Sequence, residues 1–228
     1  MSVLPASFLV ACSPAAEEPL PVVGPEAFAS AFPTGFVAEA HCTPLAAYTP
    51  PQVGADYVFR DDNGRRSSRR IVSVDGDRIG MQYRDLSTQE QKPLPPMVNI
   101  AGLFVVGTPG GTRQKTYPVD PMATLATLQV GQSAVIAASE TSTLNRRRRT
   151  VATPVTVRYL ACGRLPVAES AVAVRLYKVD SRTLILDRAR QEQLTVTSVV
   201  YAMPLASGFP VALANPKTAS RLEHLPQG

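Results

Sequence analysis

The stretch that decides the fold is YVFRDDNGRRSSRRIVSVDGDRIGMQYR, residues 57–84. Asn-Gly at 63–64 is a strong signal for a tight hairpin turn, and the Asp-Gly-Asp at 75–77 provides a second one. Apolar residues alternate with polar ones on either side of these turns, as in strands with one buried face. The stretch therefore predicts an antiparallel meander with strands at 57–59, 70–74 and 78–84.

The chain outside this meander continues the same pattern of short apolar runs between Gly, Pro and Asp. Further strands are expected at 99–106, 112–118, 133–141, 151–160, 184–186, 193–203 and 209–213, and one or two strands within 165–179. Residues 119–131 are expected to include a helical turn, and residues 180–193 have a sequence compatible with a short helix. The predicted fold class is mostly β, with about ten to twelve strands in antiparallel meanders that form a sandwich or a half-open barrel.

The domain organisation follows from composition. Residues 51–214 are expected to form the β domain, and 215–228 a polar tail. Val53-Gly54 and Val130-Gly131 each precede a strand, a basic turn and a second strand, so residues 51–118 and 119–214 are either two related β units or a chance similarity.

Composition excludes two classes of protein. Of the 228 residues, 45% are hydrophobic, which is too many for a chain disordered throughout. No run approaches the roughly 18 apolar residues that a spanning helix needs, which excludes a polytopic helical membrane protein. The net charge of +5 permits attraction to anionic surfaces without indicating one.

The N-terminus reads MSVLPASFLVAC, residues 1–12, and has no charged side chain. Its end, Leu9-Val10-Ala11-Cys12, resembles the lipobox of bacterial lipoproteins. The resemblance implies that residues 1–11 are a signal peptide, that Cys12 is lipidated, and that residues 12–50 include a Pro-rich tether. Ser13 then favours the outer membrane over the inner one. The sequence departs from the family in lacking Lys or Arg before the apolar run, and the alternative is a buried N-terminal strand with a free cysteine.

A second resemblance lies near the end of the β domain. The run YAMPLASGFPV at 201–211 is loosely similar to a late motif of periplasmic β domains of unknown function in proteobacterial lipoproteins. The resemblance implies a periplasmic location and brings no catalytic residues with it.

Two further cysteines, Cys42 and Cys162, remain in the body of the chain. In an oxidising compartment such a pair favours a disulfide, and the alternative is two unpaired core thiols. Metal binding is not expected, because there is no Cys-x-x-Cys and the two histidines, His41 and His224, lack neighbouring ligands at suitable spacing. No cofactor is expected either.

The most conspicuous charged feature is a run of arginines at the expected tip of the hairpin 133–160. Such a run suits anionic lipid, an acidic protein partner or nucleic acid, and the alternative is a solvated turn that resists aggregation. Nucleic acid is the least favoured partner, because no aromatic residue accompanies the arginines to stack on bases. The four residues are Arg146, Arg147, Arg148 and Arg149.

These observations favour a non-enzymatic envelope lipoprotein, since the sequence has no arrangement suited to nucleophilic catalysis or phosphate binding. It would be a structural or assembly partner on the periplasmic face of a membrane, contacting lipid through its acyl anchor and a protein through its β domain. One alternative is a β cradle for a lipid or another ligand. The other is a β-rich subunit of a virion or phage-tail-like particle.

Overall fold

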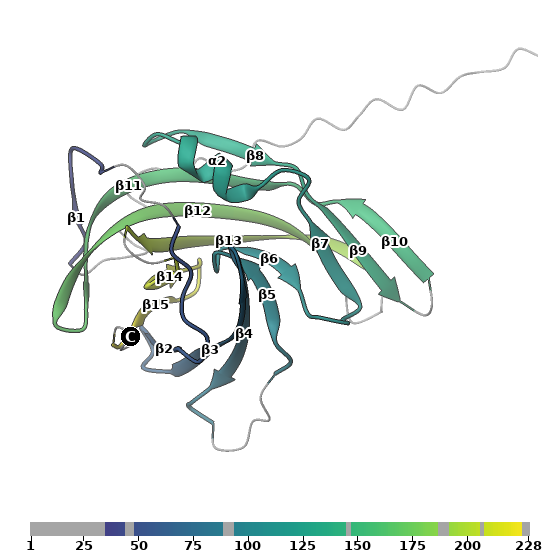
Figure 1. Ribbon diagram of the computed structural model, residues 1–228, viewed down its shortest axis with the longest axis horizontal. Coiled ribbons are helices and arrows are strands. Elements are labelled where there is room, and N and C mark those ends of the chain that lie inside the picture. Colours follow the sequence, from purple (N-terminus) through teal and green to yellow (C-terminus); the bar gives the residue numbers. More distant parts are fainter. Residues whose placement is uncertain are drawn as a thin grey trace, which may run out of the picture.

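The computed structural model describes residues 35–43, 48–88, 94–144, 147–186, 192–205 and 208–224. These residues form one antiparallel sheet and one short helix (Figure 1). The strands are β1 (Val37–Ala38), β2 (Asp56–Asp61), β3 (Arg66–Asp75), β4 (Arg78–Asp85), β5 (Met97–Ile100), β6 (Phe104–Gly107), β7 (Arg113–Thr116), β8 (Ser133–Ile136), β9 (Ser139–Leu144), β10 (Arg147–Ala152), β11 (Val155–Val167), β12 (Ser170–Leu186), β13 (Glu192–Pro204), β14 (Ala212–Ala214) and β15 (Ala219–Leu222). The helix is α2 (Pro121–Thr127).

The sheet is open and strongly curled. Its strand order is β1-β11-β12-β13-β14-β15-β2-β3-β4-β5-β6-β7-β9-β10, and β8 also pairs with β11. Three long strands, β11 to β13, run across the molecule, and β2 to β6 curve beneath them in the view of Figure 1. This architecture confirms the predicted class of a mostly β fold built from antiparallel meanders.

Two hydrophobic clusters fill opposite faces of the long strands. Val174, Leu176 and Ala202 belong to the first, while Tyr177 and Met203 belong to the second. A bulge between Tyr159 and Ala161 in β11 shifts the alternation by one residue. Consequently Val155 and Val157 face the second cluster, whereas Leu165 and Val167, beyond the bulge, face the first.

The predicted meander is present as β2, β3 and β4, with turns at the two positions expected. The hairpin expected from 133–141 and 151–160 is also present. Ser139 pairs with Ala152 and Ile136 with Val155, so the β9–β10 and β8–β11 pairings share one register. Pro154, which has no backbone N–H, lies in the gap between the two pairings.

The helical turn expected within 119–131 is confirmed as α2. Its N-cap is Asp120, whose carboxylate accepts a hydrogen bond from the backbone N–H of Met122 at 2.8 Å. Pro121 occupies the first turn, where its missing N–H costs nothing. Among the residues that the structure describes, no helix has the length and hydropathy that a membrane span requires.

One expectation about strands was wrong. Residues 99–106 are not one strand, because Ala101 and Gly102 adopt positive φ angles of 50° and 71° and turn the chain between β5 and β6. The segment 165–179, expected to form one or two strands, forms parts of two, because a turn at Ala168, φ 52°, separates β11 from β12. The option of a short helix over 180–193 is wrong at both ends, since β12 extends to Leu186 and β13 begins at Glu192, while residues 187–191 lie outside the described residues.

The two ends of the β domain also differ from the expected boundaries. Within the predicted tether, Phe36 and Tyr48 pack against the first cluster, so the folded body begins before residue 51. Within the expected polar tail, β15 pairs with β2, and Leu222 is 2% exposed. This segment is ordered because β15 lies between β14 and β2 in the sheet and pairs with both strands.

Candidate binding cavity

Two neighbouring strands, β7 and β9, carry charged side chains into the interior. Lys115 in β7 lies directly opposite Glu140 in β9. Both are almost fully buried, at 5% and 3% exposed. Buried charges are costly unless they are paired and hydrogen-bonded, so both side chains are expected to have specific interaction partners.

Lys115 is held against the β12 strand across the interior. Its Nζ donates hydrogen bonds to Ser181 Oγ at 3.0 Å and to the backbone carbonyl of Arg182 at 2.6 Å. Burial lowers the pKa of Lys115 from its usual value, the nearby Glu140 carboxylate raises it, and Arg113 lowers it further.

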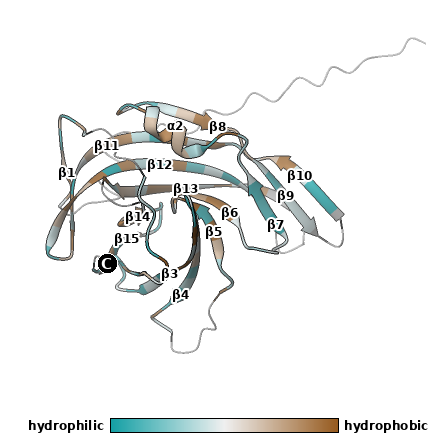
Figure 2. Ribbon diagram, in the orientation of Figure 1, coloured by the Kyte–Doolittle hydropathy of each residue, from teal (hydrophilic) through white to brown (hydrophobic). Residues whose placement is uncertain are grey.

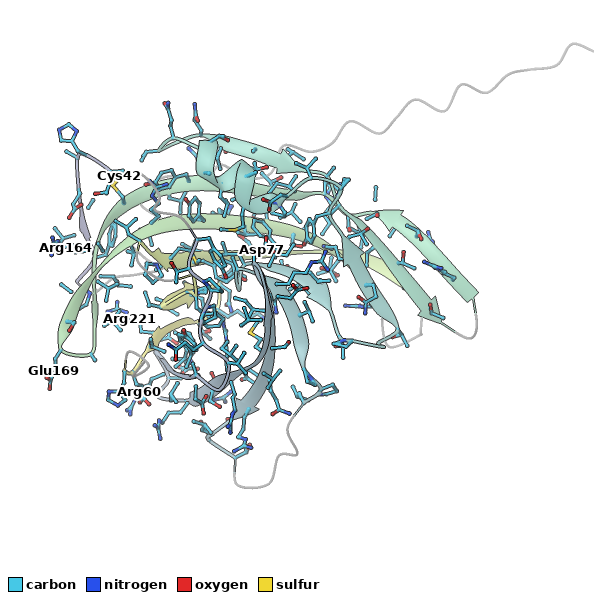
Figure 3. The ribbon with its side chains drawn as sticks, in the orientation of Figure 1. Cys42, Arg60, Asp77, Arg164, Glu169 and Arg221 are labelled. Atoms are coloured by element: carbon cyan, nitrogen blue, oxygen red, sulfur yellow. A yellow bond between two sulfur atoms is a disulfide. The ribbon has the colours of Figure 1, made fainter. Side chains whose placement is uncertain are left out.

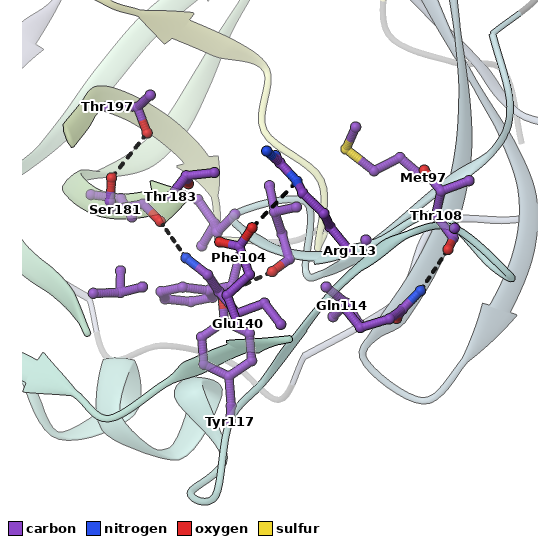
Figure 4. Close-up of a pocket in the computed structure, with 18 of the residues that line it drawn as sticks. Met97, Phe104, Thr108, Arg113, Gln114, Tyr117, Glu140, Ser181, Thr183 and Thr197 are labelled. Carbon is purple, nitrogen blue, oxygen red and sulfur yellow. Dashed lines mark hydrogen bonds and ion pairs between the residues drawn. The ribbon is translucent and has the colours of Figure 1, made fainter. Parts of the chain in front are cut away.

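Glu140 forms its ion pair with Arg113, whose Nε lies 3.3 Å from Glu140 Oε1 (Figure 4). The Arg113 side chain is 45% exposed, whereas that of Glu140 is 4% exposed. The pair therefore runs from the surface to the interior, and the two cations Arg113 and Lys115 lie beside the same carboxylate.

These side chains line a cavity of about 520 Å³ between β5–β7, β9 and the inner face of β11–β13. Tyr117 forms part of its wall, packing edge-on against Phe104 with ring centroids 6.0 Å apart and donating a hydrogen bond to the Val105 carbonyl at 3.0 Å. Burial raises the pKa of Tyr117, so its hydroxyl remains protonated at neutral pH. The other apolar lining side chains include Leu103, Val106, Val155, Val179 and Val199, and the polar ones include Thr108, Gln114, Thr183 and Thr197.

No protein-family model matches the chain, and no curated protein sequence matches it. Among solved structures it is similar to the hypothetical lipoprotein YmcC from Escherichia coli K12. That match has a TM-score of 0.44 and 11% identity, and covers 77% of this chain and 87% of YmcC. A protein of YmcC-like fold from Bacteroides fragilis NCTC 9343 matches with a TM-score of 0.43 and 12% identity, over 79% of this chain and 99% of that one.

The two body cysteines lie away from the cavity. Cys42 and Cys162 form a disulfide with an S–S distance of 1.96 Å. Figure 3 places Cys42 at the end of the molecule that holds β1, whereas β10 is at the opposite end in Figure 1. Two hydrogen bonds reinforce the link: the Glu39 N–H donates to the Cys162 carbonyl at 2.9 Å, and Arg175 donates to the Thr43 carbonyl. The disulfide therefore fastens the first described segment to β11.

Of the predicted arginine run, Arg147, Arg148 and Arg149 form the beginning of β10, in which Figure 2 shows a hydrophilic stretch and a hydrophobic end at the arrowhead. Arg146 and Cys12 lie outside the described residues, and Arg147 begins β10. Arg148 and Arg149 are exposed. Whether these arginines bind an anionic surface stays a prediction.

The strand register shows which arginines of β10 share a face of the sheet with the charged residues of the cavity. Arg149 lies opposite Ser142, and Ser142 lies opposite Arg113 in the next strand. Directly opposed residues share a face of the sheet, so Arg149 and Arg113 lie on the same face. Arg148, one residue away, faces the other side.

Arg113, Lys115 and Glu140 were not predicted from the sequence. A signal for the first two was present: Arg113, Lys115 and Tyr117 alternate with Gln114 and Thr116, which is the spacing of side chains on one face of a strand. The alternation did not reveal that this face points inward. That depends on the pairing of β7 with β9 and on the curl of the sheet over β12.

Proposed function

We propose that the chain is a non-enzymatic lipoprotein of the bacterial cell envelope. An acyl anchor at Cys12 would hold it on the periplasmic face of a membrane, more favourably the outer one. Its β domain would serve as a binding partner for another envelope component.

The observation that carries this proposal is the disulfide between Cys42 and Cys162. Disulfides persist in oxidising compartments such as the periplasm and are rare in the reducing cytosol. The bond supports export independently of the lipobox resemblance, because the two features share no residue.

The position of the disulfide also suits an anchored domain. There are 23 residues between Cys12 and Phe36, a length of chain that spans at most roughly 80 Å when fully extended. The bonded segment follows directly, with Cys42 fixed to β11 in the body of the sheet. A pull on the membrane anchor would therefore reach β1 first and then the covalent link at Cys42.

The non-enzymatic part of the proposal is supported by the chemistry of the cavity. Its carboxylate is ion-paired to Arg113, its lysine donates to Ser181 and to a backbone carbonyl, and its tyrosine hydroxyl donates to another carbonyl. These interactions suit recognition, because a general base needs a carboxylate or amine that is available to a substrate proton.

The test compares membrane fractionation of the native chain with that of Cys12→Ser in the source bacterium. We expect the native chain in the membrane fraction and Cys12→Ser in the soluble fraction. Ser13→Ala, which leaves the lipobox intact, is the matched control and should remain membrane-bound. Unchanged partitioning of Cys12→Ser would refute the anchor.

A second candidate function is a β cradle that holds a small ligand, and the cavity of about 520 Å³ favours it. Small-molecule sites are concave, mostly apolar and of roughly 300–1,000 Å³, with a few placed polar groups. Native mass spectrometry of the chain extracted from its own host would detect a bound ligand. Adduct-free protein from several gentle extractions would argue against this role.

A further inference from the structure

The described lining of the cavity is basic at one end. Among the described residues that line it, Arg113 and Lys115 are cationic, and Glu140 is the only acidic side chain. Lys115 is only 5% exposed, and its Nζ donates its two side-chain hydrogen bonds to neutral acceptors, Ser181 Oγ and the Arg182 carbonyl. A buried ammonium group in the wall of a cavity favours an anionic ligand, because an anion adds charge and hydrogen-bond acceptors beside it.

The charges are also confined to one side of the cavity. They lie on β7 and β9, whereas Phe104, Val155, Val179 and Val199 present apolar side chains from β6 and from β11 to β13. Hydroxyl groups of Ser181, Thr183 and Thr197 lie along the β12–β13 side, as Figure 4 shows. A ligand that satisfies both parts must combine an anionic end with an apolar body.

We propose that this cavity binds a single-chain anionic amphiphile, with its headgroup beside Lys115 and Arg113 and its chain along the apolar wall. The inference rests on the second proposed function, the β cradle, and specifies its ligand class. The volume of about 520 Å³ lies in the lower half of the range of small-molecule sites, which favours one chain over two.

The surroundings of Arg113 support an anionic headgroup. Arg113, the more exposed cation, is 45% exposed at the end of its ion pair with Glu140. The register places Arg149 of β10 on the same face, two strands away from Arg113. Two exposed basic side chains therefore lie on the same face of the sheet as Lys115, where they attract anions.

The test measures binding by calorimetry on the full chain carrying Cys12→Ser, below the critical micelle concentration of each probe. Dodecanoate and dodecyl phosphate are the anionic probes, and monododecanoylglycerol is the uncharged one. We expect at least one anionic probe to bind with one-to-one stoichiometry and at least tenfold more tightly than the uncharged probe. The tighter of the two anionic probes identifies a carboxylate or a phosphate headgroup.

Two substitutions should act in opposite directions. Lys115→Met keeps a long unbranched side chain and removes the charge, and should weaken anion binding at least tenfold. Glu140→Gln removes the competing carboxylate and should strengthen anion binding several-fold. Lys217→Met, which changes an exposed lysine in the loop between β14 and β15, is the matched control and should have no effect.

The outcomes separate this inference from the function on which it rests. If monododecanoylglycerol binds as tightly as the anions, or if Lys115→Met leaves anion binding unchanged, the cradle stands and the anionic ligand class is wrong. If no probe binds to a folded chain, both are wrong. Should Glu140→Gln fail to fold, Arg113→Gln replaces it and is expected to weaken anion binding.

Discussion

Reduction of the Cys42–Cys162 disulfide is expected to destabilise the folded chain by about 5 kcal/mol. The two cysteines are 120 residues apart, and the loop between them contains every strand from β2 to β10. In the chain-entropy model, a cross-link stabilises the fold by restricting the unfolded chain, with a contribution that grows with the logarithm of loop length. A loop of about 100 residues corresponds to about 4.7 kcal/mol, and this loop is slightly longer.

The assay is urea unfolding of the oxidised and reduced chains, followed by circular dichroism because the chain has no Trp. With a typical urea slope of about 2 kcal/mol per molar, the unfolding midpoint should fall by about 2.5 M on reduction. The expected change is large beside the total stability of a domain, which is about 5–15 kcal/mol.

Two controls isolate the effect of the bond. Cys12→Ser should show the same difference between oxidised and reduced forms, because Cys12 is not part of the pair. A double Cys42→Ala, Cys162→Ala variant should resemble the reduced chain and be insensitive to reductant. A difference below about 1 kcal/mol between the two forms would refute the reasoning, since the unfolded chain would then not be restricted by this link.

Three further outcomes are expected. Replacing Arg146, Arg147, Arg148 and Arg149 with Ser should leave the melting temperature nearly unchanged, since surface charges contribute within about 0.5 kcal/mol each. The same variant should bind anionic liposomes more weakly and with less dependence on salt. A large loss of stability would show that the arginines are paired within the fold. Hydrogen bonds from Arg66 and, to a lesser extent, from Arg60 lower the pKa of Glu223 below its ordinary value. This carboxylate therefore stabilises the fold above its unfolded pKa, and the stabilisation disappears as the pH falls through the lower folded pKa. Glu223→Gln should therefore be less stable than the native chain at pH 7 and equally stable near pH 2 in urea titrations, whereas a pH-independent difference would contradict this. Gly163→Ala should destabilise the fold by about 1–3 kcal/mol and loosen β1 in hydrogen exchange, because the added methyl group would overlap the β1 backbone; unchanged protection of β1 would count against the described packing.

The features of the fold that were predictable from sequence are local. The turns at Asn63-Gly64 and Asp75-Gly76-Asp77 were predicted because their residues favour tight hairpins. The turn at Ala101 was missed and the position of the turn at Ala168 was not predicted, because an alanine with positive φ has no such signature.

Features that depend on contacts between distant residues were harder to predict from the sequence. The pairing of β15 with β2 joins residues about 160 positions apart, and no local sequence pattern in 219–222 predicts it. The charged cavity has the same origin, because Lys115 and Glu140 become neighbours only when β7 pairs with β9. The number of cysteines and the expected oxidising compartment favoured a disulfide between Cys42 and Cys162. Where this bond lies in the fold depends on the antiparallel pairing of β1 with β11.

The mass of the mature chain isolated from its native membrane tests the central claim most directly, since it reports cleavage, acylation and the disulfide together. A lipoprotein of the envelope predicts a chain that begins at Cys12, carries the mass of a diacylglyceryl group and in most cases a further acyl chain, and is lighter by two hydrogens for the Cys42–Cys162 bond. A chain that still begins at Met1 or Ser2, with no added lipid, would contradict the account.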